Sequence, residues 1–250
     1  AINLATSLAQ AGRRVLLVDL DPQGNLTSGV GLKGKRGPGG TVYDALVSDV
    51  APESCVLQTA VESLWLMPAD RNLTGAEIEM VNLPEREGRL RRFLGHLGKN
   101  FDYLIIDCPP SLGLLTLNAL VAADTVLIPL HCEYFALEGL AELVGTMRRV
   151  KGSLNPRLDI EGVLLTMYDE RTNLGQLVAR DVREFFRDKV FNTVIPRNVR
   201  LGEAPSHGMP AVVYDPRSRG AAAYVALAAE LLARETLAAK GAIVEGKSRE

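Results

Sequence analysis

Residues 15–18 form an apolar run without polar alternation, and this pattern predicts a strand over residues 15–19 that is buried on both faces. Similar runs predict strands at residues 61–67, 102–107, 125–130, 158–167 and 190–195. Apolar positions at helical spacing predict helices at residues 2–9, 41–47, 73–81, 85–97, 112–122, 137–150, 174–186 and 221–239. Strands that alternate with helices of this length form a mainly parallel sheet through right-handed crossovers. The pattern therefore predicts an α/β fold with helices on both faces of the sheet.

Three stretches lack a regular pattern. The high glycine content of residues 26–40 predicts a mobile surface loop, and the lack of a periodic pattern in residues 197–210 predicts an irregular segment. Residues 240–250 are polar, which predicts a frayed tail.

Composition narrows the class of protein. The 250 residues are 47% hydrophobic and 23% charged, as in globular proteins, and no apolar run is long enough to cross a membrane. The three cysteines show no CxxC spacing, which favours reduced thiols in the cytosol over a metal site. The formal net charge is −2, so any binding of nucleic acid must use a local basic patch.

Acidic residues end two of the predicted buried strands. Asp19 ends the first strand, Asp21 follows it, and Asp107 ends the strand at residues 102–107. Chemistry in open α/β sheets collects at the carboxyl ends of parallel strands, and a nucleoside-triphosphate hydrolase needs acids there for magnesium and for the attacking water. The alternative is that these residues only cap turns, which is an ordinary role for aspartate.

Five segments resemble the ParA/Soj family of chromosome- and plasmid-partitioning ATPases, in the order of that family and over essentially the whole chain. They are Asp19-Leu-Asp-Pro-Gln-Gly-Asn25, Ile106-Asp-Cys-Pro-Pro-Ser-Leu-Gly113, Glu133-Tyr-Phe-Ala-Leu-Glu-Gly139, Thr193-Val-Ile-Pro-Arg-Asn-Val-Arg200 and Tyr214-Asp-Pro-Arg-Ser-Arg-Gly220. The resemblance implies a P-loop NTPase-like fold with one ATPase domain over residues 1–240, followed by a polar tail at 241–250. It also implies ATP and Mg²⁺ as ligands.

The chain departs from this family at one point. The family's deviant P-loop, Lys-Gly-Gly-x-Gly-Lys-Thr-Thr, does not precede the helix that begins Ala1-Ile2-Asn3. We therefore expect an amino-terminal truncation that removes the first, central strand and leaves two buried strands without a neighbour. Each unpaired ladder group costs roughly 1–3 kcal/mol, against a typical stability of about 5–15 kcal/mol. We expect the chain alone to be weakly stable and to bind ATP poorly.

The resemblance implies roles for individual residues. Asp21 matches the acid that positions the attacking water, and Asp19 matches an acid that helps to order the magnesium shell. Asp107 matches the Walker B acid, which contacts magnesium through water. Pro196 and Asn198 match the segment around the adenine, and Met167 is expected to line the same pocket.

The family binds DNA non-specifically as an ATP-held dimer, and a ParB/Spo0J-like protein stimulates its hydrolysis. The resemblance therefore implies a cytoplasmic, nucleoid-associated homodimer that does not bind membranes. The candidate DNA contacts are Arg171, Arg197, Arg200, Arg217 and Arg219, with Lys189 as a weaker candidate; for each, the alternative is a solvated surface charge.

Two other functions remain open from the sequence. A MinD-like regulator of division cycles on membranes through an amphipathic carboxyl-terminal helix, but residues 241–250 contain two glycines and two bulky apolar residues, which disfavours this reading. The second alternative is an inactive remnant that binds no nucleotide.

Overall fold

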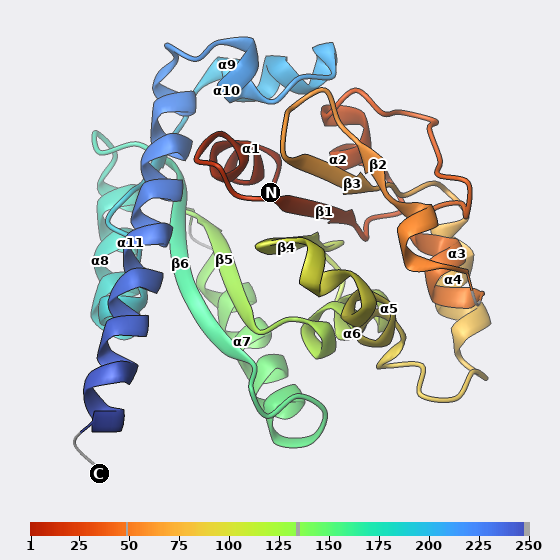
Figure 1. Cartoon of the computed structure of the whole chain (residues 1–250). Helices are drawn as coiled ribbons and strands as arrows, with labels where there is room; N and C mark the ends of the chain where they lie inside the picture. The colour runs from red at the N-terminus through yellow and green to blue at the C-terminus, as the bar shows by residue number, and fades with distance from the viewer. Residues whose placement is uncertain (49, 134–135, 248–250) are drawn as a thin grey trace.

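The strands form one layer in two parts, and helices cover both of its faces (Figure 1). The computed structural model describes residues 1–48, 50–133 and 136–247. The strands are β1 (Val15–Asp19), β2 (Leu57–Gln58), β3 (Leu64–Met67), β4 (Tyr103–Asp107), β5 (Thr125–His131), β6 (Asp159–Tyr168) and β7 (Ile195–Pro196). The helices are α1 (Ile2–Gln10), α2 (Asn25–Gly29), α3 (Val42–Val47), α4 (Leu73–Met80), α5 (Arg89–Leu97), α6 (Leu114–Ala122), α7 (Ala136–Ser153), α8 (Asn173–Phe186), α9 (Val199–Glu203), α10 (Ala211–Tyr214) and α11 (Arg219–Lys247). The predicted α/β class is confirmed.

The apolar run at the start of the chain forms β1, which lies inside the first part of the sheet. This part has the order β2-β3-β1-β4. β1 is parallel to β3 and β4, and all five of its residues are buried, whereas β2 runs antiparallel to β3. The second part has the order β5-β6-β7, and its strands are parallel. The sheet is thus mainly parallel, as predicted.

β4 and β5 end the two parts of the sheet and do not pair with each other. All five residues of β4 are partly exposed, and β5 exposes Thr125, Pro129 and His131. Ile105 of β4 and Leu127 of β5 nevertheless border the same apolar core, next to α1 and α11. Within the described residues no strand joins these two edges. The missing central strand stays a prediction.

Side chains that alternate along β1 pack into two different cores. Leu16 and Val18 belong to the core under α3, α4, α5 and α6, whereas Val15 and Leu17 belong to the core shared by α1 and α11. A third core joins β5 and β6 to α7 and α8. Because successive strand residues point to opposite faces, β1 requires apolar side chains from Val15 to Val18.

The two stretches predicted to be irregular contain short helices. Residues 26–40 hold most of α2, which begins after Gly24, and residues 197–210 hold α9. The side chain of Asn198 caps α9 by accepting a hydrogen bond from the Arg200 N–H at 3.0 Å. The expectation of an irregular path was therefore wrong in part at both places, and at α9 the side-chain cap satisfies one of the first N–H groups of the helix.

Some predicted boundaries also differ. α5 begins at Arg89 rather than at 85, since Glu85 has a φ of +50°, which a helix does not allow. The last strand shrinks to β7, and Val190 forms only an isolated bridge with Val163. α11 continues to Lys247, so the predicted frayed tail is helical over residues 240–247.

Candidate functional site

Three aspartates lie at the carboxyl edge of the first part of the sheet. Asp19 and Asp107 end β1 and β4 and are paired in the register of these two parallel strands. The Leu20 N–H donates to the Asp107 carbonyl at 2.9 Å, and this bond extends the pairing by one residue. Asp21 follows directly. The sequence predicted the acids at the ends of two strands, and the structure brings these strand ends together.

Asp19 is fully buried and accepts three hydrogen bonds from the protein. Its Oδ2 accepts from the Thr27 N–H at 2.8 Å and from the Thr27 hydroxyl at 2.6 Å, and its Oδ1 accepts from the Asp21 N–H at 3.3 Å. The Thr27 hydroxyl also accepts a hydrogen bond from the Ala69 N–H at 3.1 Å. Burial raises the pKa of Asp19, although the hydrogen bonds from Thr27 and Asp21 oppose this change. Asp19 therefore ties the turn that follows β1 to α2 and to the end of β3.

Asp21 sits in a tight turn between β1 and α2. Its Oδ1 accepts a hydrogen bond from the Gln23 N–H at 2.9 Å, and its carbonyl accepts from the Gly24 N–H at 2.9 Å. Gly24 has a φ of +62°, a left-handed conformation that favours glycine. This turn leaves the second carboxylate oxygen of Asp21 without a protein donor among the described residues, so it is free to accept from a ligand or water.

Asp107 is partly buried next to this turn. Burial raises the pKa of its carboxyl; the positive charge of the amino terminus at Ala1 opposes this change, and the negative charge of Asp21 adds to it. Within the described residues, no group of three or more His, Cys, Asp or Glu side chains is placed to hold a metal ion. Two carboxylates still fit Mg²⁺, which proteins commonly hold through one or two carboxylates together with water and substrate phosphates.

The three residues predicted to surround a base meet at the ends of β6 and β7. Tyr168 of β6 pairs with Pro196 of β7, and Met167 lies beside this pair with a φ of +49° and 47% of its surface exposed. Asn198 follows two residues after Pro196. A positive φ at a residue other than glycine is strained, and such strain is common at ligand sites. Their predicted contact with adenine stays a prediction.

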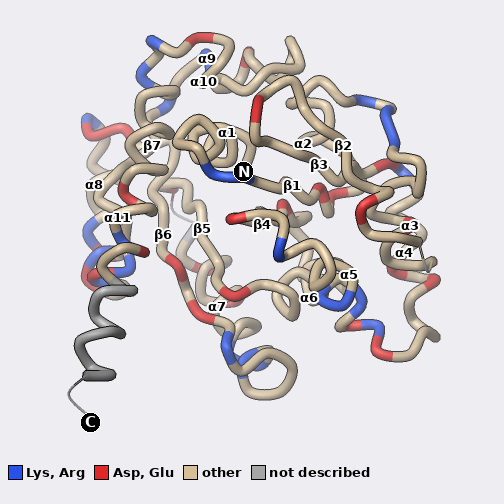
Figure 2. The backbone as a smooth tube through the Cα atoms, in the orientation of Figure 1, with Lys and Arg blue, Asp and Glu red and all other residues tan. Residues whose placement is uncertain are grey.

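The predicted basic residues differ in their partners. Arg171 donates two hydrogen bonds to Asp169, at 2.9 and 2.7 Å, and these lower the pKa of that carboxyl. Arg200 pairs with Glu203 at 2.7 Å and with Asp215 at 3.2 Å. Arg197, Arg217 and Arg219 form no ion pair within the described residues. Figure 2 shows basic and acidic segments interleaved around α9. The weaker candidate, Lys189, also has a partner, because it pairs with Asp159 at 3.1 Å. Among the candidate DNA contacts, three arginines therefore carry a charge that no acidic side chain of the described residues neutralises.

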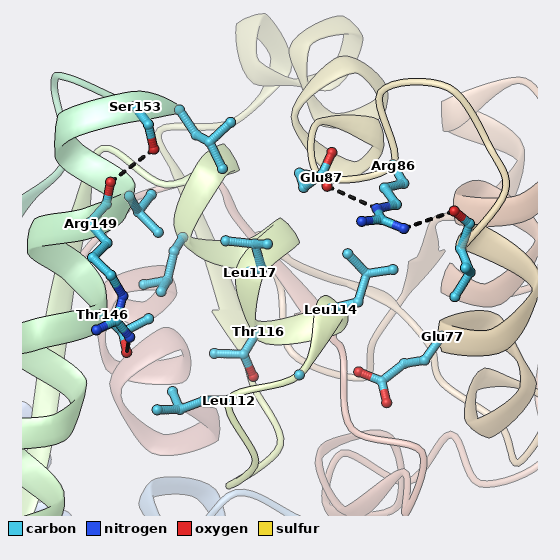
Figure 3. Close-up of a pocket in the computed structure, with 15 residues that line it drawn as sticks. Glu77, Arg86, Glu87, Leu112, Leu114, Thr116, Leu117, Thr146, Arg149 and Ser153 are labelled. Carbon is cyan, nitrogen blue, oxygen red and sulfur yellow. Dashed lines mark hydrogen bonds and ion pairs between the residues drawn. The ribbon is translucent and has the colours of Figure 1, made fainter.

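A cavity of about 570 Å³ opens elsewhere, among α6, α7 and the segment from α4 to α5 (Figure 3). Leucines line its floor, whereas Glu77, Arg86 and Arg149 lie at its sides. The Glu77 carboxylate accepts a hydrogen bond from the Leu115 N–H at 3.2 Å at the start of α6. None of the predicted site residues lines this cavity.

Comparison with known proteins identifies the family. A family model described as an AAA domain matches residues 1–160. The chain is 58% identical to the sporulation initiation inhibitor protein Soj of Bacillus subtilis over 233 residues, which cover 93% of the chain and 92% of that protein. It is 54% identical to the chromosome partitioning protein ParA of Myxococcus xanthus over 236 residues, or 94% of the chain and 83% of that protein. The chain belongs to the ParA/Soj family of partitioning ATPases.

Solved structures agree with this assignment to the ParA/Soj family. A structure described as cobyrinic acid a,c-diamide synthase from Mycobacterium smegmatis, with bound ADP and magnesium, is 39% identical and superimposes with a TM-score of 0.79, covering 92% of this chain and 86% of that one. The cell division ATPase MinD of Pyrococcus furiosus is 27% identical with a TM-score of 0.74, covering 92% and 90%. These similarities confirm a P-loop NTPase-like fold. The predicted truncation stays a prediction.

Among the described residues no helix is both long and apolar enough to cross a membrane. The segment Glu133-Tyr-Phe-Ala-Leu-Glu-Gly139 carried part of the resemblance, and its Tyr134 and Phe135 lie outside the described residues. Sequence reasoning missed Thr27, because a threonine eight residues after Asp19 carries no signal that its hydroxyl meets that carboxylate.

Proposed function

We propose that this protein is a partitioning ATPase that binds ATP with Mg²⁺ at the carboxyl edge of its sheet, dimerises around the nucleotide and then binds DNA. The observation that carries this proposal is the register pairing of Asp19 with Asp107, followed directly by Asp21 in a glycine-ended turn. Acids on adjacent parallel strands are what a nucleotide hydrolase needs at this edge. The membership of the chain in the ParA/Soj family supports the same reaction.

Each aspartate has a separate role in this proposal. Asp21 orients the attacking water with its free carboxylate oxygen, and Asp107 holds Mg²⁺ through water. Bound Mg²⁺ supplies charge stabilisation at the phosphates. Asp19 acts as a positioning residue, since its oxygens already accept hydrogen bonds from Thr27 and Asp21. By holding the Asp21 N–H, Asp19 limits where the Asp21 carboxylate can point.

The base lies against the ends of β6 and β7 in this proposal. Met167 and Pro196 supply apolar surface for the ring, and the amide nitrogen of Asn198 supplies a donor. The oxygen of that amide already accepts from the Arg200 N–H, which fixes the amide's orientation. This arrangement favours a flat ligand with hydrogen-bonding edges.

The 250 residues contain no Lys-Gly-Gly-x-Gly-Lys-Thr-Thr motif. We propose that one further parallel strand, leading into such a loop, fits between β4 and β5. Both edges are unpaired within the described residues, and β4 is partly exposed at every position although four of its five residues are apolar or aromatic. Unpaired apolar strand edges are a liability that proteins normally cover.

A chimaera tests this function. The strand and P-loop of Bacillus subtilis Soj, joined before Ala1, should give ATP hydrolysis and an ATP-dependent dimer by light scattering, and the 250-residue chain alone should give neither. A chimaera that folds but does not hydrolyse ATP would contradict the proposed function.

The Asp21→Ala variant of this chimaera should lose hydrolysis and keep ATP binding, because the lost carboxylate acts only on the water. Asp181→Ala, on the exposed face of α8, is the matched control and should retain both. Normal turnover in Asp21→Ala would show that another group positions the water.

The same proposal assigns a surface and a partner. DNA contacts lie on Arg197, Arg217 and Arg219, whose charges have no ion-pair partner within the described residues, with weaker contributions from Arg171 and Arg200. Phosphate contacts of this kind make binding fall steeply with salt. A ParB-type protein stimulates hydrolysis, and binding to DNA places the dimer on the nucleoid.

A further inference from the structure

Helix α6 has its polar side chains turned inward. The helix runs from Leu114 to Ala122 and contains two polar residues, Thr116 and Asn118, which are both buried. Leu114 and Leu117 are only partly buried, and both line the cavity shown in Figure 3. A surface helix of a globular protein normally turns its polar side chains toward water. The outer face of α6 therefore has the composition of a packing surface.

Hydrogen bonds hold α6 in this orientation. The Thr116 hydroxyl donates to the Ser111 carbonyl at 2.6 Å. The amide nitrogen of Asn118 donates to the Arg86 carbonyl at 2.8 Å, and the amide oxygen accepts from the Leu90 N–H at 3.2 Å. Rotation of the helix would break these bonds, and a buried polar group without a partner is unfavourable. The leucines are thus kept at the cavity by the contacts of their polar neighbours.

Apolar surface continues from the cavity onto its rim. Val81, Leu112 and Leu154 line the cavity and are 50%, 41% and 38% exposed. Figure 3 shows Leu112 and Ser153 at opposite ends of the cavity, so it extends along α6. Nine helical residues span about 13 Å. Exposed apolar surface that is rimmed by polar residues marks interaction sites. We call this cavity with its rim the α6 groove.

One wall of the α6 groove, on the side of α7, carries positive charge. Arg149 of α7 donates a hydrogen bond to the Thr146 hydroxyl at 2.9 Å. Arg91 donates to the Leu154 carbonyl at 3.1 Å, at the end of the groove. Both acceptors are neutral, and neither guanidinium forms an ion pair in the part of the chain that the structure describes. Two positive charges on this side therefore lack an acidic partner among these residues.

The charges of the opposite wall are already compensated. Arg86 pairs with Glu87 at 2.9 Å. The Glu77 carboxylate accepts a hydrogen bond from the Leu115 N–H in the first turn of α6, where the helix dipole stabilises negative charge. The charge of the groove that remains uncompensated is positive. An occupant with acidic side chains directed at α7 complements it.

We propose that the α6 groove binds an amphipathic helix of a partner protein, which presents leucines to α6 and acidic side chains to Arg149. A helix that binds in a groove uses apolar side chains at positions i, i+3, i+4 and i+7. These four positions span about 10 Å, which fits the length of α6. Because Leu112 follows Asp107 by five residues, the bound helix also touches the segment that leads away from this strand end.

The test uses a labelled synthetic peptide of about 18 residues, long enough to form a helix. It carries leucine at the four positions and glutamate at the flanking ones, and a matched peptide carries lysine in place of each glutamate. Fluorescence anisotropy with the 250-residue chain measures the affinity of both. The parent chain should bind the glutamate peptide at least about 10-fold more tightly than the lysine peptide.

A charge reversal locates the binding site. Arg149→Glu should bind the glutamate peptide about 10-fold more weakly than the parent and the lysine peptide more tightly, because the apolar contacts stay the same. Arg180→Glu is the matched control: Arg180 is an exposed residue of α8, outside the groove, so both affinities should stay within about 2-fold of the parent.

A second pair of variants tests the apolar contacts. Leu117→Ser should weaken the binding of both peptides by about 10-fold, since it removes apolar surface and leaves the charges unchanged. Leu174→Ser is the matched control, because Leu174 is 43% exposed on α8, and it should bind both peptides like the parent. Arg149→Glu changes an exposed side chain and keeps the test valid if Leu117→Ser does not fold.

Several outcomes overturn the proposal. A parent chain that does not bind the glutamate peptide, or that binds both peptides equally, contradicts the stated chemistry of the partner. Unchanged affinities in Arg149→Glu place the binding site elsewhere. A dimer of the parent that Leu117→Ser abolishes, seen by light scattering, assigns the groove to a second copy of this chain instead. Binding of laurate in the absence of peptide binding assigns it to a small amphiphile. No nucleotide is used, so each of these results leaves the proposed function standing.

Discussion

Replacing Thr27 by valine tests whether the contact between Asp19 and Thr27 holds the turn that presents Asp21. The Thr27 side chain is buried, at 2% exposure, and its hydroxyl makes two hydrogen bonds at once. It donates to the buried Asp19 carboxylate at 2.6 Å and accepts from the Ala69 N–H at 3.1 Å. Valine preserves the shape and removes both bonds.

The magnitude follows from these two contacts. A hydrogen bond to a charged group contributes about 1.5–3 kcal/mol, and leaving the Ala69 N–H unpaired costs roughly 1–3 kcal/mol more. We expect Thr27→Val to lower the free energy of unfolding by about 3–5 kcal/mol, because effects in one network are not fully additive. Thr6→Val is the matched control: Thr6 is fully buried, and its hydroxyl bonds only the Ile2 carbonyl of its own helix.

Urea unfolding followed by circular dichroism and by the fluorescence of Trp65, the one tryptophan, provides the assay. With a slope of about 3 kcal/mol per molar urea, Thr27→Val should move the midpoint down by about 1 M or more. Thr6→Val should move it by less than about 0.3 M, because its loss is below about 1 kcal/mol. Equal shifts in the two variants would refute the reasoning, since the contact with Asp19 would then contribute nothing beyond a local helix bond.

Two further predictions concern charge. The pKa of Asp107 is raised in the folded chain, so folding favours its protonated form, and stability falls as pH rises from below the unfolded value of about 3.9 through the folded value. Asp107→Asn should therefore have a higher urea midpoint than the parent chain at pH 7, and the two midpoints should become equal near pH 3.5. A difference in midpoint that does not vary with pH would contradict the buried-charge explanation. In the Soj chimaera with ATP, Arg217→Ala with Arg219→Ala should weaken DNA binding and reduce the salt slope by about 2. A double change of Arg171 and Arg200, whose charges are already paired, should reduce the salt slope less. A larger reduction for Arg171 and Arg200 than for Arg217 and Arg219, measured by fluorescence anisotropy, would place the DNA surface elsewhere.

The pattern of apolar positions determined the class of fold and the general place of the site. Val15 to Val18 are apolar without alternation, so only a position covered on both faces suits them, and β1 occupies such a position. Asp19 and Asp107 end two such strands, and the geometry of parallel sheets brings strand ends to one edge. Both inferences use local sequence and a general property of sheets.

Some features required a local contact that the sequence suggests only weakly. The pairing of Arg171 with Asp169 spans two residues and was open to prediction, whereas the pairing of Arg200 with Asp215 spans fifteen and depends on the path between α9 and α11. α2 and α9 are too short for a periodic pattern to reveal; α2 begins after the left-handed Gly24, and α9 begins at the cap that Asn198 supplies.

Only the tertiary structure decided how the acids are used. Asp19 and Asp21 are the same residue type two positions apart, yet Asp19 is turned inward to Thr27, whereas one carboxylate oxygen of Asp21 has no protein donor in the described part of the chain. The division of the sheet between β4 and β5 likewise depends on contacts between segments distant in the chain. The physical reason is that hydrogen bonds and burial are set by which segments meet in space, while the sequence alone specifies which segments are able to be buried.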